Sequence, residues 1–162
     1  MDGEMIKVGM ADLNVCHSPN AITTLGLGSC VGVALYDKST GIAGLVHVML
    51  PDSTKVRQNQ NKAKFADTGI ELLIEMMQKE GAKRSMLTAK IAGGAQMFAF
   101  STNNDMLRVG ERNVEAVKKK LQELGIRILA QDTGENFGRT VEFYPETGDF
   151  VIKSVGKPVR TI

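Results

Sequence analysis

The chain has 162 residues, of which 43% are hydrophobic and 23% charged, and its formal net charge is +2. This length and composition predict one domain over residues 1–162 with a sizeable buried core. A nucleic-acid-binding protein is excluded, because the chain has no broad basic stripe and no Trp for base stacking.

The N-terminus lacks the basic-then-apolar pattern of a secretory signal, and no stretch approaches the roughly 18–20 apolar residues of a membrane span. The chain contains only two cysteines, so a disulfide framework is not expected and the thiols should be reduced. These features predict a cytoplasmic protein without membrane insertion.

The first third of the chain contains four short apolar runs with the composition of strands, at Met5–Leu13, Ile22–Leu25, Val31–Tyr36 and Gly41–Leu50. The first of them favours an edge strand. The second leads into the glycine-rich loop Gly26–Cys30. The last two flank the polar turn Asp37–Thr40 and therefore predict a β-hairpin.

Two later segments have helical periodicity. Phe65–Glu80 is followed by Gly81, and Arg112–Leu124 by Gly125, and glycine is the usual residue after a helix C-terminus. Further strands are expected at Ala89–Ala92, Arg127–Gln131, Arg139–Tyr144 and Phe150–Val155. Because strands cluster and hairpins dominate, the pattern predicts an α+β fold rather than a doubly wound parallel sheet.

The hairpin brings two reactive side chains together. If Tyr36 and Gly41 close its turn, Cys30 lies directly opposite His47, with Cβ atoms about 4.5–5.5 Å apart on one face. The other face is then a core surface, and a one-residue slip would move His47 onto it. The expected neighbours of the Cys/His pair are small and leave room: Gly32, Ala34, Gly41 and Ala43.

A thiol beside an imidazole is the minimal unit of cysteine nucleophilic catalysis, and a neighbouring imidazolium would raise the thiolate fraction of Cys30. Gly26, Gly28 and Ser29 allow the preceding backbone to turn sharply. The amides of Ser29 and Cys30 could then face a developing oxyanion. The alternative is a buried structural cysteine with a hydrogen-bonded core His47.

Other motifs do not fit the sites that their residue types suggest. Zinc prefers residues of the types found at Cys16, His17, Cys30 and His47, but their spacing fits no familiar site, and no metal is expected. Asp132–Gly134 occurs once, whereas aspartic-protease chemistry needs two carboxylates, so a turn at a strand end is favoured. The glycine pattern before Cys30 lacks the third glycine and the helix of a dinucleotide site.

Several segments together resemble the CheD family of chemoreceptor glutamine deamidases. The resemblance is carried by Thr24–Cys30, His47–Ser53, Lys90–Ala95, Gly110–Val114 and Ala130–Gly134, and it covers nearly the whole chain. It implies that Cys30 is the nucleophile, His47 the general base and acid, and Thr24 the group that orients the imidazole. From the residues alone, a structural hydroxyl at Thr24 is equally compatible.

The resemblance also implies packed mixed and antiparallel β-sheets flanked by helices, similar to the catalytic domain of cytotoxic necrotizing factor toxins. The implied activity is that of a protein-glutamine glutaminase without cofactor, which releases ammonia from glutamines of the receptor's cytoplasmic coiled coil through a thioester. Hydrolysis of glutamyl methyl esters is a possible side activity of the same chemistry.

Family members also bind a CheC-type phosphatase, so the alternative function is that of a regulatory partner of the receptor or of this phosphatase, with catalysis secondary. Phe98 and Phe100 are candidate anchors for such a partner, because they follow a Gly-Gly turn and aromatic residues dominate interface hot spots. Both could equally be core residues.

Overall fold

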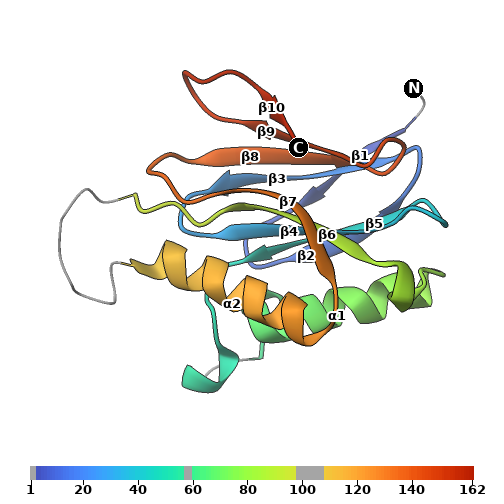
Figure 1. Ribbon diagram of the computed structural model, residues 1–162, viewed down its shortest axis with the longest axis horizontal. Helices are drawn as coiled ribbons and strands as arrows, with labels where there is room; N and C mark the ends of the chain where they lie inside the picture. The colour runs from blue at the N-terminus through green and yellow to red at the C-terminus, as the bar shows by residue number, and fades with distance from the viewer. Residues whose placement is uncertain (1–2, 57–59, 98–107) are drawn as a thin grey trace.

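Two five-stranded β-sheets are stacked face to face, and two helices cover the outer face of one of them (Figure 1). This computed structural model describes residues 3–56, 60–97 and 108–162. The first sheet has the strand order β1 (Met5–Val8), β3 (Ala21–Leu27), β8 (Arg139–Tyr144), β9 (Asp149–Lys153), β10 (Arg160–Thr161). The second has the order β2 (Leu13–His17), β5 (Ile42–Val48), β4 (Val31–Asp37), β6 (Thr88–Gly93), β7 (Arg127–Thr133).

Both sheets are mixed. The pairs β1–β3 and β6–β7 are parallel, whereas the other ladders are antiparallel. The α+β prediction of packed mixed sheets is therefore confirmed. No helix of the described segments is long and apolar enough to span a membrane.

The second sheet is the middle layer, which explains why its central strands are almost continuously apolar. Every residue of β5 is buried, and so is nearly every residue of β4. One face of these strands packs against the helices α1 (Ala66–Lys79) and α2 (Val109–Glu123) through Val31, Val33, Leu35, Val46 and Val48. The other face packs against the first sheet. A strand covered on both faces needs apolar residues at every position.

The helices lie close to their predicted ranges, and each buries a single stripe. The stripe of α1 contains Ile70, Leu73, Ile74 and Met77, which recur at helical spacing. The stripe of α2 contains Gly110, Asn113, Val117 and Leu121. Asn113 is the polar member of that stripe, and it is fully buried.

The N-terminal segment Met5–Leu13 differs from its prediction as one edge strand. It forms β1 and then a turn, after which β2 begins in the other sheet. Ala11 has a φ of 55°, which shows the sharp reversal between the two strands. The short strands β2 and β10 were not expected.

The β4–β5 hairpin is confirmed, but its turn lies one residue further along the chain than predicted. Asp37 pairs with Ile42, so the connection is Lys38–Gly41. Gly41 has a φ of 72°, and its amide donates to the Asp37 carbonyl at 3.0 Å. Glycine adopts this left-handed conformation without the steric cost that a side chain imposes, so Gly41 belongs in the turn rather than in a strand.

Because the turn lies one residue later than predicted, the residue of β4 that pairs with His47 is two positions later than predicted. His47 lies opposite Gly32, and Cys30 precedes the last pair, Val31 with Val48. Cys30 is therefore a diagonal neighbour of His47 rather than its direct partner. In a regular antiparallel pair, diagonal neighbours are about 7–8 Å apart, whereas the Cβ atoms of a direct pair are about 4.5–5.5 Å apart. A shift of two residues preserves the face of every side chain, so both residues still point to the same side.

The small residues on that face do not leave an open space. The first sheet packs directly against them, and a Cβ added at Gly32 would lie 3.1 Å from Leu27 Cδ1 of β3. Ala34 and Ala43 are fully buried in the core between the sheets. Their small size therefore permits the close stacking of the two sheets.

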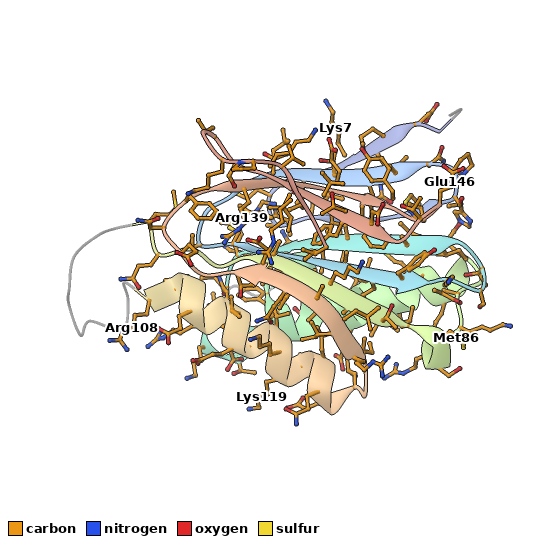
Figure 2. The ribbon with its side chains drawn as sticks, turned by 45° about the horizontal axis from the view of Figure 1, so that its top comes forward. Lys7, Met86, Arg108, Lys119, Arg139 and Glu146 are labelled. Carbon is orange, nitrogen blue, oxygen red and sulfur yellow. The ribbon has the colours of Figure 1, made fainter. Side chains whose placement is uncertain are left out.

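A buried ion pair joins the two sheets beside this core. Asp132 of β7 accepts from Arg139 Nε of β8 at 2.8 Å and from Arg160 Nη1 of β10 at 2.6 Å. The Arg139 side chain has no exposed surface, and Figure 2 shows it in the layer between the sheets. Asp132 and Thr133 are the last two residues of β7 and Gly134 follows the strand, so the segment lies at a strand end, as expected, but Asp132 and Thr133 are strand residues rather than part of a turn. The ion pair of Asp132 was not predicted.

Asp132→Ala should lower the free energy of unfolding by about 3–5 kcal/mol, because it leaves the Arg139 charge buried without its partner. Arg160→Ala is the matched control. The Arg160 side chain is 63% exposed, and its loss should cost about 1 kcal/mol or less. Urea unfolding of both variants measures the difference, and equal losses would contradict a dominant role of the buried pair.

Candidate active site

The predicted nucleophile, base and orienting group lie on three segments from both sheets. Cys30 ends the loop Gly28–Cys30, which crosses from β3 in the first sheet to β4 in the second. His47 lies near the end of β5, and Thr24 lies on β3. All three are buried: Cys30 is 8% exposed, Thr24 1% and His47 0%. The site is therefore in the layer between the sheets.

Thr24 holds one nitrogen of the imidazole. Thr24 Oγ1 lies 2.7 Å from His47 Nδ1 and donates to the Val8 carbonyl at 2.8 Å. A hydroxyl has one hydrogen, and a carbonyl oxygen can only accept. The hydroxyl must therefore accept from Nδ1–H, so His47 carries its proton on Nδ1 and has a free lone pair on Nε2.

That second nitrogen has no partner among the described residues, although it is buried. An unsatisfied buried acceptor is rare and marks a place for a donor. Cys30 lies on the same face of the second sheet as His47. The thiol of Cys30 is therefore a candidate partner for Nε2, since catalytic hydrogen bonds are often long or unformed without substrate.

Burial keeps both groups neutral in the resting site. It raises the pKa of the Cys30 thiol and lowers the pKa of His47. Desolvation disfavours every charged form, so a thiolate–imidazolium pair is opposed from both sides. The expectation that a resting imidazolium raises the thiolate fraction of Cys30 is not supported.

The loop before the cysteine is held by its carbonyl groups. The carbonyls of Gly28, Ser29 and Cys30 accept, in this order, from Ala95 N at 2.9 Å, Asn113 Nδ2 at 3.0 Å and Gly94 N at 2.8 Å. The backbone comes so close here that a Cβ at Gly93 would collide with the Cys30 carbonyl oxygen. The last position of β6 thus requires glycine.

The same bonds orient the amide groups of the loop. In a trans peptide the N–H points away from the carbonyl of the preceding residue. Because the Gly28 and Ser29 carbonyls face their donors, the N–H groups of Ser29 and Cys30 point to the opposite side. Neither has a hydrogen-bond partner within the described part of the chain. Two adjacent free amides next to a thiol are suited to bind an oxyanion.

A β-bulge shapes the entry to this loop. The pairing of β3 with β8 shifts between Thr24 and Leu27, and Gly26 lies inside the shift with a φ of 70°. Bulges next to active sites re-aim side chains. Here Leu25 is turned outward and is 61% exposed. The predicted role of Gly26 in a sharp backbone turn fits this geometry.

The four residues considered as zinc ligands, Cys16, His17, Cys30 and His47, do not lie together at one site. Cys16 pairs with Ala43, which is about 13 Å from His47 along β5 at roughly 3.3 Å per residue. His17 is half-exposed and bonds Glu80 at 2.8 Å. No cluster of three or more His, Cys, Asp or Glu suited to a metal ion occurs in residues 3–56, 60–97 and 108–162.

Sequence reasoning missed Asn113. This residue belongs to a segment that carries the family resemblance, but no role was assigned to it. Its spacing was a usable signal, because Asn113, Val117 and Leu121 recur every fourth position on the buried face of α2. A polar residue in such a stripe calls for a partner. Phe98 and Phe100, the candidate partner anchors, lie outside the described residues.

Comparisons with known proteins identify relatives over the whole chain. A family model described as "CheD chemotactic sensory transduction" matches residues 49–154. The chain is 69% identical over 160 residues to a "Probable chemoreceptor glutamine deamidase CheD" of Lachnoclostridium phytofermentans, covering 99% of both chains. It is 58% identical over 160 residues to the "Chemoreceptor glutamine deamidase CheD" of Halalkalibacterium halodurans, covering 98% of this chain and 99% of that protein.

The pKa directions predict how Cys30 reacts with iodoacetamide in the free protein. Alkylation requires the thiolate. Since burial raises the pKa of Cys30, the rate should rise with pH and reach its midpoint above the ordinary thiol value of about 8.5. The measurement is best made in a Cys16→Ala background by mass spectrometry. A rate already maximal at neutral pH would instead show a preformed thiolate–imidazolium pair.

Proposed function

The chain belongs to the CheD family, and on this premise we propose that it is a chemoreceptor glutamine deamidase, a protein-glutamine glutaminase with Cys30 as nucleophile. The observation that carries the proposal is the 2.7 Å bond between Thr24 and His47, which leaves the buried His47 Nε2 free on the face that carries Cys30. A core histidine with a purely structural role would have both ring nitrogens satisfied.

The first half of the reaction forms a thioester. His47 Nε2 takes the proton of Cys30 Sγ as the sulfur attacks the side-chain carbonyl carbon of the substrate glutamine. The carbonyl oxygen becomes an oxyanion, for which the free amides of Ser29 and Cys30 are the donors. The imidazolium then gives its proton to the amide nitrogen, the carbon–nitrogen bond breaks and ammonia leaves.

The second half releases glutamate. Water gives a proton to His47 Nε2 and attacks the thioester carbon, and the carbon–sulfur bond breaks. Sulfur recovers the proton, which restores the neutral thiol and imidazole. Throughout the cycle Thr24 accepts from Nδ1–H, so the imidazolium that forms transiently remains hydrogen-bonded.

The proposed substrate is a glutamine of the receptor's cytoplasmic coiled coil. The name shared by the relatives, chemoreceptor glutamine deamidase, supports this substrate class. The same acyl chemistry serves a glutamyl methyl ester, since methanol can leave in place of ammonia. We also propose that a CheC-type phosphatase binds the chain and restrains this activity, which the family resemblance supports.

Replacement of each cysteine in turn should distinguish the proposed nucleophile from the other thiol. Cys30→Ala should abolish deamidation, whereas Cys16→Ala should be nearly silent in activity, because Cys16 lies at the other end of β5 from His47. The assay is mass spectrometry of a receptor cytoplasmic fragment, read as the conversion of Gln to Glu. An active Cys30→Ala protein would refute the proposal and favour the regulatory alternative.

The two adjacent threonines provide a matched test of the orienting bond. Thr24→Val removes the acceptor for His47 Nδ1, and Thr23→Val removes a comparable buried bond to the Val141 carbonyl, at 2.7 Å, without touching the imidazole. Thr24→Val should lower kcat markedly and Thr23→Val only slightly. His47→Asn provides the reference for these losses, because removal of a general base should lower kcat by about 10²–10⁴-fold. Equal losses for both threonines would assign Thr24 a structural role.

A further inference from the structure

One side chain of α2 connects the nucleophile loop to the strand of the base. Asn113 Nδ2 donates to the Ser29 carbonyl at 3.0 Å and to the Met49 carbonyl at 2.9 Å. Ser29 immediately precedes Cys30, and Met49 follows β5 shortly after His47. A single carboxamide therefore ties together the two backbone segments that carry the reacting groups.

The chemistry of the contact requires an amide. Nδ2 has two hydrogens, and each meets a carbonyl oxygen that can only accept, so the orientation of the carboxamide follows from its partners. Asn113 has no exposed surface, and its Oδ1 has no partner among the described residues. The helix thus buries a polar group at an incomplete hydrogen-bonding site, which points to a role beyond packing.

The bond to Ser29 controls one specific atom of the proposed mechanism. The Ser29 carbonyl and the Cys30 N–H belong to the same planar peptide. Rotation of this peptide would swing the Cys30 N–H out of the oxyanion position. The neighbouring bonds from Gly94 and Ala95 hold the carbonyls of Cys30 and Gly28, so the Ser29 carbonyl depends on Asn113 for its hydrogen bond.

We propose that Asn113 is a positioning residue for the deamidation: it fixes the Ser29–Cys30 peptide so that the Cys30 amide faces the oxyanion, and it holds this loop against the strand of His47. The inference rests on the proposed function. Through this peptide, a residue of α2 would affect the stability of the transition state without touching the substrate.

Two reactions of the same sulfur separate positioning from general stability. Deamidation passes through an oxyanion, whereas alkylation of Cys30 by iodoacetamide forms none. Asn113→Ala and Asn113→Asp both remove the two N–H donors. The Ala side chain is smaller and leaves a cavity, whereas the Asp side chain keeps the shape of Asn. The control is Val117→Ala, since Val117 is buried in the same helix and its apolar side chain has no donor for the Ser29 or Met49 carbonyl.

In both Asn113 variants kcat for the receptor fragment should fall on the order of 10²-fold with KM nearly unchanged. The alkylation rate of Cys30 should stay close to that of the wild type. Val117→Ala should lower the melting temperature while kcat, measured well below that temperature, stays near the wild-type value. Because a cavity and a buried carboxylate destabilise by different mechanisms, one variant suffices if the other does not fold.

The inference would be overturned by an unchanged kcat in a folded Asn113 variant, by equal losses in deamidation and alkylation, or by an equal loss of kcat in Val117→Ala. Inability to obtain either Asn113 variant in folded form, while Val117→Ala folds, would make the residue a structural one and also overturn it. A wild-type protein without deamidase activity would instead refute the proposed function itself.

Discussion

The hydrogen bond between Thr24 and His47 crosses from one β-sheet to the other, and the candidate site exists only while the two sheets are stacked. The orientation of the imidazole is thus a property of the sheet packing rather than of a local loop. Small residues make this packing possible, because Gly32 and Ala34 allow the first sheet to approach closely. The buried pair of Asp132 and Arg139 joins the same two layers at another point.

Burial gives the site a neutral resting state. The pKa of Cys30 is raised and that of His47 is lowered, so neither the thiolate nor the imidazolium is favoured before substrate arrives. A buried neutral thiol is a poor target for oxidants and alkylating agents. The proposed attack therefore couples proton transfer to substrate binding, when the developing charge first meets the free amides of the loop.

The loop that carries Cys30, the proposed nucleophile, has its own support, separate from that of His47. Its carbonyls are held by the backbone that follows β6 and by Asn113 of α2, whereas the imidazole is held from β3. Met49 is the link between them, because Asn113 also binds the carbonyl beyond the end of β5. A loop with every carbonyl engaged can present its amides in a fixed direction, which is the requirement for stabilising an oxyanion without reorganisation.

Strand periodicity alone places Cys30 and His47 on one face of the hairpin. Strand side chains alternate with a period of two, so Cys30 and His47 share a face whether their pairing is direct or diagonal. The same local periodicity predicted both helices and most strands, and the motifs from Thr24 to Ser53 carried the family resemblance, which supplied the roles of Thr24, Cys30 and His47.

The contacts between distant parts of the chain could not be predicted in this way, because they depend on how the elements pack together. The left-handed Gly41 moved the turn and made Cys30 a diagonal neighbour of His47. The bonds of Asn113 to Ser29 and Met49, and that of Asp132 to Arg139, depend on how sheets and helices pack. Local periodicity shows that a residue is buried, but its partner is set by the stacking of elements that are far apart in the sequence.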